Sequence, residues 1–124
     1  MNISISNNAD TPIYKQIYDQ ISGQILRGEL DSDETLPSIR AIALELRISV
    51  ITIKKAWEEL EKDGLIYTVL GKGCFIASVS AKKLQNKRDE FAQDKIKKDI
   101  KYYKELGLSQ DELIRLVKDH FDEK

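Results

Sequence analysis

The sequence predicts a mainly α-helical chain with a small β-hairpin, in which three helices precede the hairpin and two follow it. Apolar residues recur every three or four positions in several segments, the spacing that gathers them on one face of a helix. Two short apolar runs flank Gly71-Lys72-Gly73, which is typical of a hairpin. Beyond residue 79 the composition changes to charged helix, so a second segment is expected there.

The first helix is expected to begin at Thr11-Pro12 and to end at Gly28. Thr11 can cap a helix, and proline suits the first helical position because its missing N–H leaves no bond unmade. The apolar face consists of Ile13, Ile17, Ile21 and Ile25. Before this helix, Met1 to Ile5 alternate weakly, which favours a short extended arm.

The second and third helices are expected to form a helix-turn-helix. Leu36-Pro37-Ser38 leads into a short helix whose buried face is Ile39, Ile42, Ala43 and Leu46. After a tight connection at Arg47-Ile48, Ser49 is a natural N-cap for a helix that runs to about Lys62. The core face of this third helix is Ile53, Ala56, Trp57 and Leu60.

The hairpin follows the third helix directly. Its strands are expected within Leu65 to Leu70 and Cys74 to Val79. Earlier in the chain, Glu29 to Thr35 are acidic and polar and are expected to form the loop between the first two helices. Three helices followed by a hairpin are a winged helix-turn-helix, and we expect residues 1–79 to form this domain. A phosphate loop at Gly71-Lys72-Gly73 is disfavoured because the Walker spacing and a following helix are absent.

Residues 80–124 are expected to form a two-helix dimerisation tail. A long helix spans about Ala81 to Leu106, Gly107 breaks it, and Ser109 to Glu112 is a capping box that opens the last helix. The apolar residues of the tail are Phe91, Ile96, Ile100, Tyr103, Leu113, Val117 and Phe121. Two helices bury such a set poorly by themselves, so we predict a homodimer. The alternative is that the tail packs back onto its own winged helix.

Composition limits the functional classes. The net charge is −1, and the balance is −3 for residues 1–80, so bulk charge does not favour nucleic acid and local placement must decide. The single cysteine, Cys74, excludes a disulfide within the chain and fits a cytoplasmic protein. No signal peptide or membrane span is apparent. No nucleophile–base pair, metal set or cofactor motif stands out, so we expect neither an enzyme nor a bound cofactor or metal.

The third helix carries the candidate binding residues. Its N-terminal turns would meet the major groove of double-stranded DNA, as in other helix-turn-helix proteins. This places Ser49, Val50, Ile51, Thr52, Lys54 and Lys55 at the groove. The acidic residues Glu58, Glu59 and Glu61 come later, so the order of charge suits docking by the N-terminal end. The alternative is an ordinary surface helix of a three-helix core.

Residues 12 to 78 resemble the GntR family of transcription regulators. The resemblance lies in Leu36-Pro37-Ser38-Ile39-Arg40, Ala43, Ile48-Ser49, Thr52-Ile53, Ala56, Leu60-Glu61, Gly64-Leu65-Ile66 and Gly71-Lys72-Gly73-Cys74-Phe75-Ile76. The opening Ile13-Tyr14-Lys15-Gln16-Ile17 and the short helical tail resemble the YtrA-type subgroup. Two positions depart from the family pattern: Val50 stands where the family often has Arg or Pro, and Asp33 where it usually has Gly.

The resemblance implies roles for matched positions. Arg40 is implied to clamp a phosphate or reach a base edge, and Ser38 to hydrogen-bond the DNA backbone. Lys72 is implied to enter the adjacent minor groove, with Gly71 and Gly73 allowing the tight turn. We therefore expect a homodimeric repressor that reads an inverted repeat. A winged helix that binds only protein is the rival interpretation, and a small-molecule effector is left open.

Overall fold

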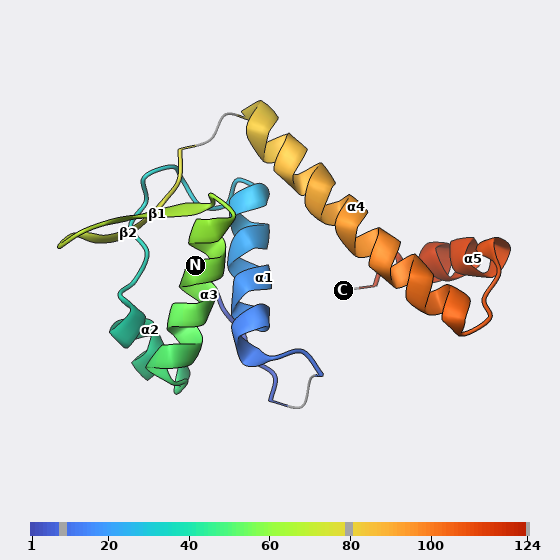
Figure 1. Cartoon of the computed structure of the whole chain (residues 1–124), viewed down its shortest axis with the longest axis horizontal. Coiled ribbons are helices and arrows are strands. Elements are labelled where there is room, and N and C mark those ends of the chain that lie inside the picture. The colour runs from blue at the N-terminus through green and yellow to red at the C-terminus, as the bar shows by residue number, and fades with distance from the viewer. Residues whose placement is uncertain (8–9, 79–80, 124) are drawn as a thin grey trace. The chain divides into compact units, whose positions relative to one another are not determined.

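The computed structural model describes residues 1–7, 10–78 and 81–123. The chain divides into two compact units, Met1–Leu84 and Gln85–Lys124. In chain order the elements are α1 (Ile13–Leu26), α2 (Ile39–Leu46), α3 (Val50–Lys62), β1 (Ile66–Val69), β2 (Gly73–Ile76), α4 (Ala81–Glu105) and α5 (Gln110–His120) (Figure 1). The predicted fold class, a winged helix-turn-helix followed by two helices, is confirmed.

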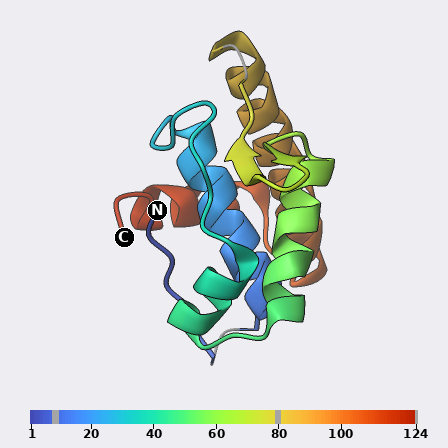
Figure 2. The same cartoon turned by 90° about the vertical axis from the view of Figure 1, so that its left-hand side faces the viewer.

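The core of the first unit lies between the helices and the hairpin. Helices α1 and α3 pack side by side, and α2 lies at one end of this pair (Figures 1 and 2). Ile17 and Ile21 of α1 and Ile53 and Leu60 of α3 are completely buried, and Trp57 is nearly so. These are the positions that the helical spacing assigned to the core, because a period of 3.6 residues places them on one face.

The start of α1 differs from the prediction. Pro12, not Thr11, is the N-cap, and no side chain caps this helix. Pro12 has an extended backbone and its carbonyl oxygen accepts from the N–H groups of Lys15 and Gln16, both at 3.1 Å. The predicted cap at Thr11 was therefore wrong by one residue. At the other end Gly28, with a φ of +75°, ends the helix as expected.

Serine side chains begin α2 and α3. Ser38 Oγ accepts from the N–H of Ala41, and Ser49 Oγ accepts from the N–H of Thr52, each at 3.1 Å. Such caps satisfy N–H groups that have no partner inside the helix. Arg47 joins the two helices in a left-handed conformation with a φ of +58°, which makes the connection tight.

The hairpin has the predicted position and a regular register. Strands β1 and β2 pair antiparallel, with Tyr67 opposite Phe75 and their rings stacked at 5.4 Å. The turn closes with Lys72 N–H donating to the carbonyl oxygen of Val69 at 2.9 Å. Val79, which the sequence placed in the second strand, lies outside the described residues.

The segment before α2 is not the free loop that its polar composition predicted. It runs along β2 and hydrogen-bonds to it: Asp33 N–H donates to Ile76 O at 2.8 Å and Leu36 N–H donates to Cys74 O at 2.9 Å. Thr35 forms an isolated bridge with Phe75. This pairing fixes the entry to α2 beside the wing, the hairpin of β1 and β2.

The second unit is a helical hairpin. Gly107 has a φ of +88° and ends α4, while Leu108 N–H donates to the carbonyl oxygen of Tyr103 at 3.1 Å. The predicted capping box is present, because Ser109 Oγ accepts from Glu112 N–H and a Glu112 carboxylate oxygen accepts from Ser109 N–H. In the described part of the chain, no helix combines the length and apolar character that crossing a membrane requires.

Candidate nucleic-acid interface

The N-terminal end of α3 is open to solvent. Ser49, Val50 and Ile51 are exposed, and Ile51 keeps 80% of its accessible surface. The hydroxyl groups of Ser49 and Thr52 also form a hydrogen bond, with 2.7 Å between their oxygen atoms, so the cap side chain is held in place. A helix N-terminus presents unpaired N–H groups and a partial positive charge, both of which attract phosphate.

Charge is graded along α3. Lys54 and Lys55 are exposed near the open end, whereas Glu58 and Glu61 follow in later turns. The Lys55 ammonium group lies 4.1 Å from the centroid of the Tyr14 ring, which is a cation–π contact between α1 and α3. The aromatic ring therefore orients one of the predicted cations.

A buried tyrosine ties the far end of α3 to α1. The hydroxyl of Tyr18 donates to the carboxylate of Asp63, directly after the last residue of α3. Burial, together with this hydrogen bond and the negative charge of Asp63, raises the pKa of Tyr18 well above its usual value. The helix that carries the candidate contacts is thus held to α1 through Lys55 near its middle and through Asp63 directly after its last residue.

A cleft of about 420 Å³ lies between the start of α2 and the wing. Ser38 and Arg40 line it from the start of α2, Lys72 lines it from the wing, and Trp57 contributes to its lining from the core. The pairing of the chain before α2 with β2 explains this convergence. Three predicted contact residues, Ser38, Arg40 and Lys72, therefore border one concave surface.

The wing tip is exposed and tightly turned. Gly71 and Gly73 have φ values of +79° and +108°, a region that side chains disfavour and glycine tolerates. Lys72 between them is exposed. Cys74, in β2, is half-buried and also lines the cleft.

One cation of this region was not selected from the sequence. Arg47 is exposed in the connection between α2 and α3, directly before the open end of α3. The signal that could have found it is the helix-turn-helix connection itself, which places its residues next to the start of the second helix. Arg47 therefore joins the candidate residues.

The second unit contains a groove of about 610 Å³ between α4 and α5. Of the predicted tail residues, those that line it are Ile96, Ile100, Tyr103, Leu113 and Val117. Phe91 and Phe121 are not part of the lining. Leu108 also lines the groove, although it was not selected from the sequence. It stands directly before the N-cap Ser109 and five residues before Leu113, which is the arrangement of a hydrophobic staple.

Comparison with known proteins identifies the family. The model of bacterial regulatory proteins of the gntR family matches residues 13–76. The chain belongs to the GntR family. The uncharacterized HTH-type transcriptional regulator YhcF of Bacillus subtilis is 35% identical over 107 residues, which are 86% of this chain and 88% of YhcF. The repressor YtrA of the same organism is 37% identical over 75 residues, 62% of this chain and 58% of YtrA.

Solved structures agree with this assignment. A GntR family transcriptional regulator from Listeria monocytogenes has a TM-score of 0.71 at 29% identity and covers 90% of this chain and 97% of its own. AraR(DBD) in complex with operator ORX1 has a TM-score of 0.54 at 29% identity, covering 62% of this chain and 96% of its own. The chain is thus a GntR-family regulator of YtrA type.

The structure gives a reason for one departure of this GntR-family regulator from the family pattern. Asp33 stands where the family resemblance leads us to expect Gly, and its φ is +64°. Aspartate tolerates the left-handed region better than most residues, although less well than glycine. The Asp33 carboxylate also accepts a hydrogen bond from the Tyr67 hydroxyl at 2.8 Å, which raises the pKa of Tyr67. The side chain thereby links the segment before α2 to the wing.

Proposed function

We propose that this GntR-family regulator binds double-stranded operator DNA as a homodimer and represses transcription. The N-terminal end of α3 enters the major groove, and the wing lies against the adjacent minor groove. The observation that carries the proposal is that Arg40 and Lys72 border one cleft. The AraR complex with operator DNA and the repressor YtrA support it by similarity. Such a regulator acts on chromosomal DNA, so we infer a cytoplasmic location.

The contacts divide into those that hold the DNA backbone and those that read bases. Arg40 and Lys72 attract phosphate or the minor groove, and the Ser38 hydroxyl still has a proton to donate because it accepts from Ala41 N–H. The α3 residues proposed for the major groove are Ser49, Val50, Ile51, Thr52, Lys54 and Lys55. Val50 and Ile51 form no hydrogen bonds with bases, so their role is contact with thymine methyl groups.

The proposed dimer contact lies on the tail, and the partner that covers its apolar surface is a second copy of the chain. Among the described residues of the second unit no side chain is buried, and Ile96, Ile100 and Val117 keep 50%, 38% and 56% of their surface. Apolar groups exposed together favour association because covering them removes apolar surface from water. A two-fold dimer presents two copies of α3 and therefore matches an inverted repeat.

The DNA contact is tested by salt dependence. An operator is first selected from a random duplex library, and its affinity is measured between 50 and 300 mM salt for Arg40→Ala and Lys72→Ala. Each phosphate contact adds about 0.9 to the slope of log K against log salt, so losing one contact per protomer lowers it by about 1.8. Arg27→Ala is the matched control, because Arg27 is exposed at the end of α1 and pairs with Glu29. Slopes equal to wild type in both test variants would refute the proposed contacts.

The dimer is tested by a pair of substitutions on α4. Ile100→Asp places a charge in the groove, whereas Tyr102→Asp places one on an exposed residue that does not line it. Sedimentation equilibrium should give a dimer for wild type and Tyr102→Asp and a monomer for Ile100→Asp. A wild-type chain that sediments as a monomer at micromolar concentration would contradict the proposal.

A further inference from the structure

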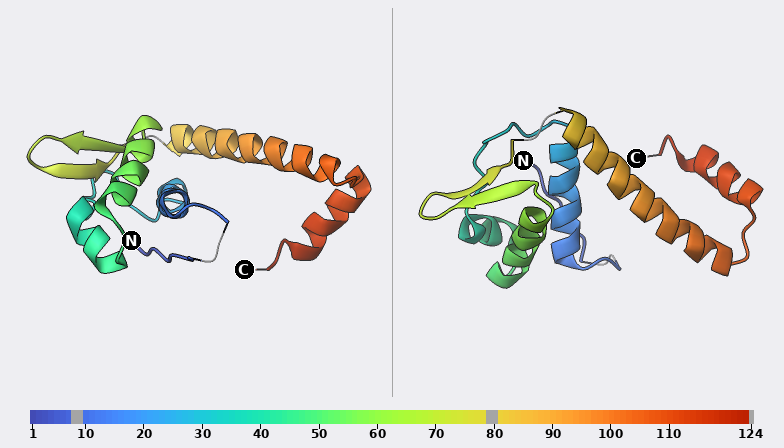
Figure 3. Two further views of the ribbon diagram at one scale, coloured as in Figure 1. Left: turned by 60° about the horizontal axis from the view of Figure 1, so that its bottom comes forward. Right: turned by 45° about the horizontal axis from the view of Figure 1, so that its top comes forward.

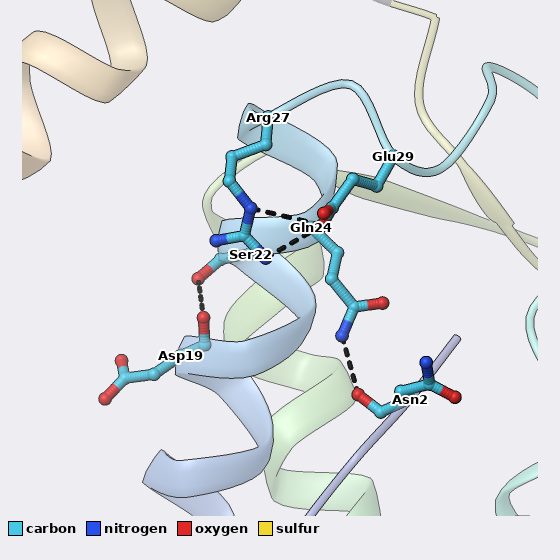
Figure 4. A network of polar contacts seen from close by, with 6 residues as sticks. All are labelled: Asn2, Asp19, Ser22, Gln24, Arg27 and Glu29. Atoms are coloured by element: carbon cyan, nitrogen blue, oxygen red, sulfur yellow. Dashed lines mark hydrogen bonds and ion pairs between the residues drawn. The ribbon is translucent and has the colours of Figure 1, made fainter. Parts of the chain in front are cut away.

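Three glutamines of α1 form hydrogen bonds with the main chain of the first residues. Figure 3 shows the course of these residues beside α1, and Figure 4 shows the bond between Gln24 and Asn2. Gln16 and Gln20 each form two hydrogen bonds with a single residue: the Gln16 amide with the N–H and C=O of Ser6, both at 2.9 Å, and the Gln20 amide with those of Ser4, at 2.8 and 2.6 Å. Gln24 Nε2 donates to the carbonyl oxygen of Asn2 at 2.7 Å.

The geometry of a helix and of an extended chain explains this arrangement. Gln16, Gln20 and Gln24 follow one another every four residues, which is about 6.0 Å along a helix. Their partners Ser6, Ser4 and Asn2 follow every second residue in the opposite direction, which is about 6.6 Å along an extended chain. The two repeats nearly match, so the long glutamine side chains absorb the difference over the two steps.

The glutamine hydrogen bonds involve main-chain atoms of the arm, residues Met1–Ser6, and do not depend on its sequence. In an extended chain the N–H and C=O of one residue point to the same side, and those of the next residue point to the other side. Asn2, Ser4 and Ser6 therefore turn their main-chain groups toward the glutamines. The side chains of Ser4 and Ser6 are exposed and take no part in these bonds, while Ile3 and Ile5 are half-buried.

We propose that the Gln16–Gln20–Gln24 face of α1 is a binding site for an extended polypeptide main chain and that its ligand is the arm of the same chain. Gln16 and Gln20 each provide one donor and one acceptor to the arm, which is the pair that a neighbouring β-strand would provide, and Gln24 provides a donor. The site accepts any side chain at the alternate positions, but it excludes proline where it needs an N–H. This inference is independent of DNA binding.

The test is amide hydrogen exchange of the full chain, measured by NMR and corrected for intrinsic rates. Ser4 and Ser6 should exchange about tenfold more slowly than Ile3 and Ile5, because only the first two donate to glutamines. Gln20→Ala should remove the protection of Ser4, while the amide of Ile21 inside α1 keeps its protection. Equal exchange of all four arm residues in the wild type would overturn the proposal, and so would Ser4 protection that survives Gln20→Ala.

Substitutions in the arm separate main-chain from side-chain recognition. Ser4→Ala keeps the N–H and should leave the protection of Ser6 unchanged, whereas Ser4→Pro removes the N–H and should lower it. Loss of protection in Ser4→Ala would show that the hydroxyl group is recognised instead.

A mixing experiment identifies which arm binds to the glutamines. Isotope-labelled Gln20→Ala chain is mixed with excess unlabelled wild type. If the arm binds its own α1, Ser4 of the labelled chain stays unprotected, and recovery would assign the site to the arm of a second copy.

Discussion

Ser49 combines two properties that substitutions can separate, the cap of α3 and the proposed approach to DNA. Its Oγ accepts from Thr52 N–H at 3.1 Å, and it is exposed at the open end of the helix. Alanine removes the cap without adding charge. Aspartate is as good an N-cap as serine, but it adds a negative charge where we propose that phosphate lies nearby. The two variants should therefore have opposite profiles.

The magnitudes follow from the structure. Losing the cap in Ser49→Ala should lower the free energy of unfolding by about 1 kcal/mol. For a unit of this size, Met1–Leu84, that corresponds to a decrease in Tm of about 4–8 °C. Ser49→Asp keeps the cap and complements the helix dipole, so its stability should equal or exceed that of the wild type by about 0.5 kcal/mol. Its affinity for DNA should fall for every sequence, because the added charge repels phosphate irrespective of the bases.

The assay combines thermal unfolding with DNA binding at 100 mM salt. We expect Ser49→Asp to be the stable variant that binds at least tenfold more weakly. Ser49→Ala should be the less stable variant, and its affinity at 20 °C should be closer to that of the wild type. Wild-type affinity in Ser49→Asp would show that the start of α3 does not approach the duplex. Wild-type stability in Ser49→Ala would show that the cap contributes nothing.

Three further substitutions test separate parts of the argument. Asp33→Ala and Asp33→Gly both lose the bond to Tyr67, but only glycine adopts the positive φ without strain, so Asp33→Ala should unfold at a lower urea concentration than Asp33→Gly. Tyr18 has a raised pKa and stays protonated when folded, whereas the unfolded chain releases its proton above about pH 10. The contribution of Tyr18 to stability should therefore be constant below pH 9 and fall between pH 10 and 11 by up to about 1.4 kcal/mol per pH unit, so Tyr18→Phe should lose less stability over this range. Ile51→Ala should weaken binding to the selected operator without changing the salt slope, and uracil in place of thymine should affect the wild type more than the variant.

Local features were predictable from the sequence because their causes are local. Ser49 and Ser109, the two serine caps that the sequence predicted, each accept a hydrogen bond from the N–H three residues later, so a short sequence pattern indicated both caps. The core positions of α3 follow in the same way from the helical period. Pro12 was misplaced by one residue, since proline suits both the first position of a helix and the residue before it.

Contacts through main-chain groups could not be predicted in the same way. The segment at Asp33 to Leu36 pairs with β2 through N–H and C=O groups, which every residue except proline carries, so its polar side chains indicated only a loop. The arm is a similar case. The spacing of Gln16, Gln20 and Gln24 is visible in the sequence, but their ligand is a backbone without a distinguishing composition.

The convergence of Arg40 and Lys72 depends on that main-chain pairing, which is why the sequence alone indicated each residue but not their common cleft. The same reasoning resolves the apparent conflict between DNA binding and a net charge of −1. The cations proposed to meet DNA lie at the start of α2, the open end of α3 and the wing tip, whereas Glu58 and Glu61 lie farther along α3. An approach by the side of α3 that carries Glu58 and Glu61 brings carboxylates toward phosphate, so an approach by the open end of α3 is favoured. A unit with net negative charge and this distribution has a lower non-specific affinity for DNA. Its docking direction is defined, because the carboxylates on its other faces repel phosphate.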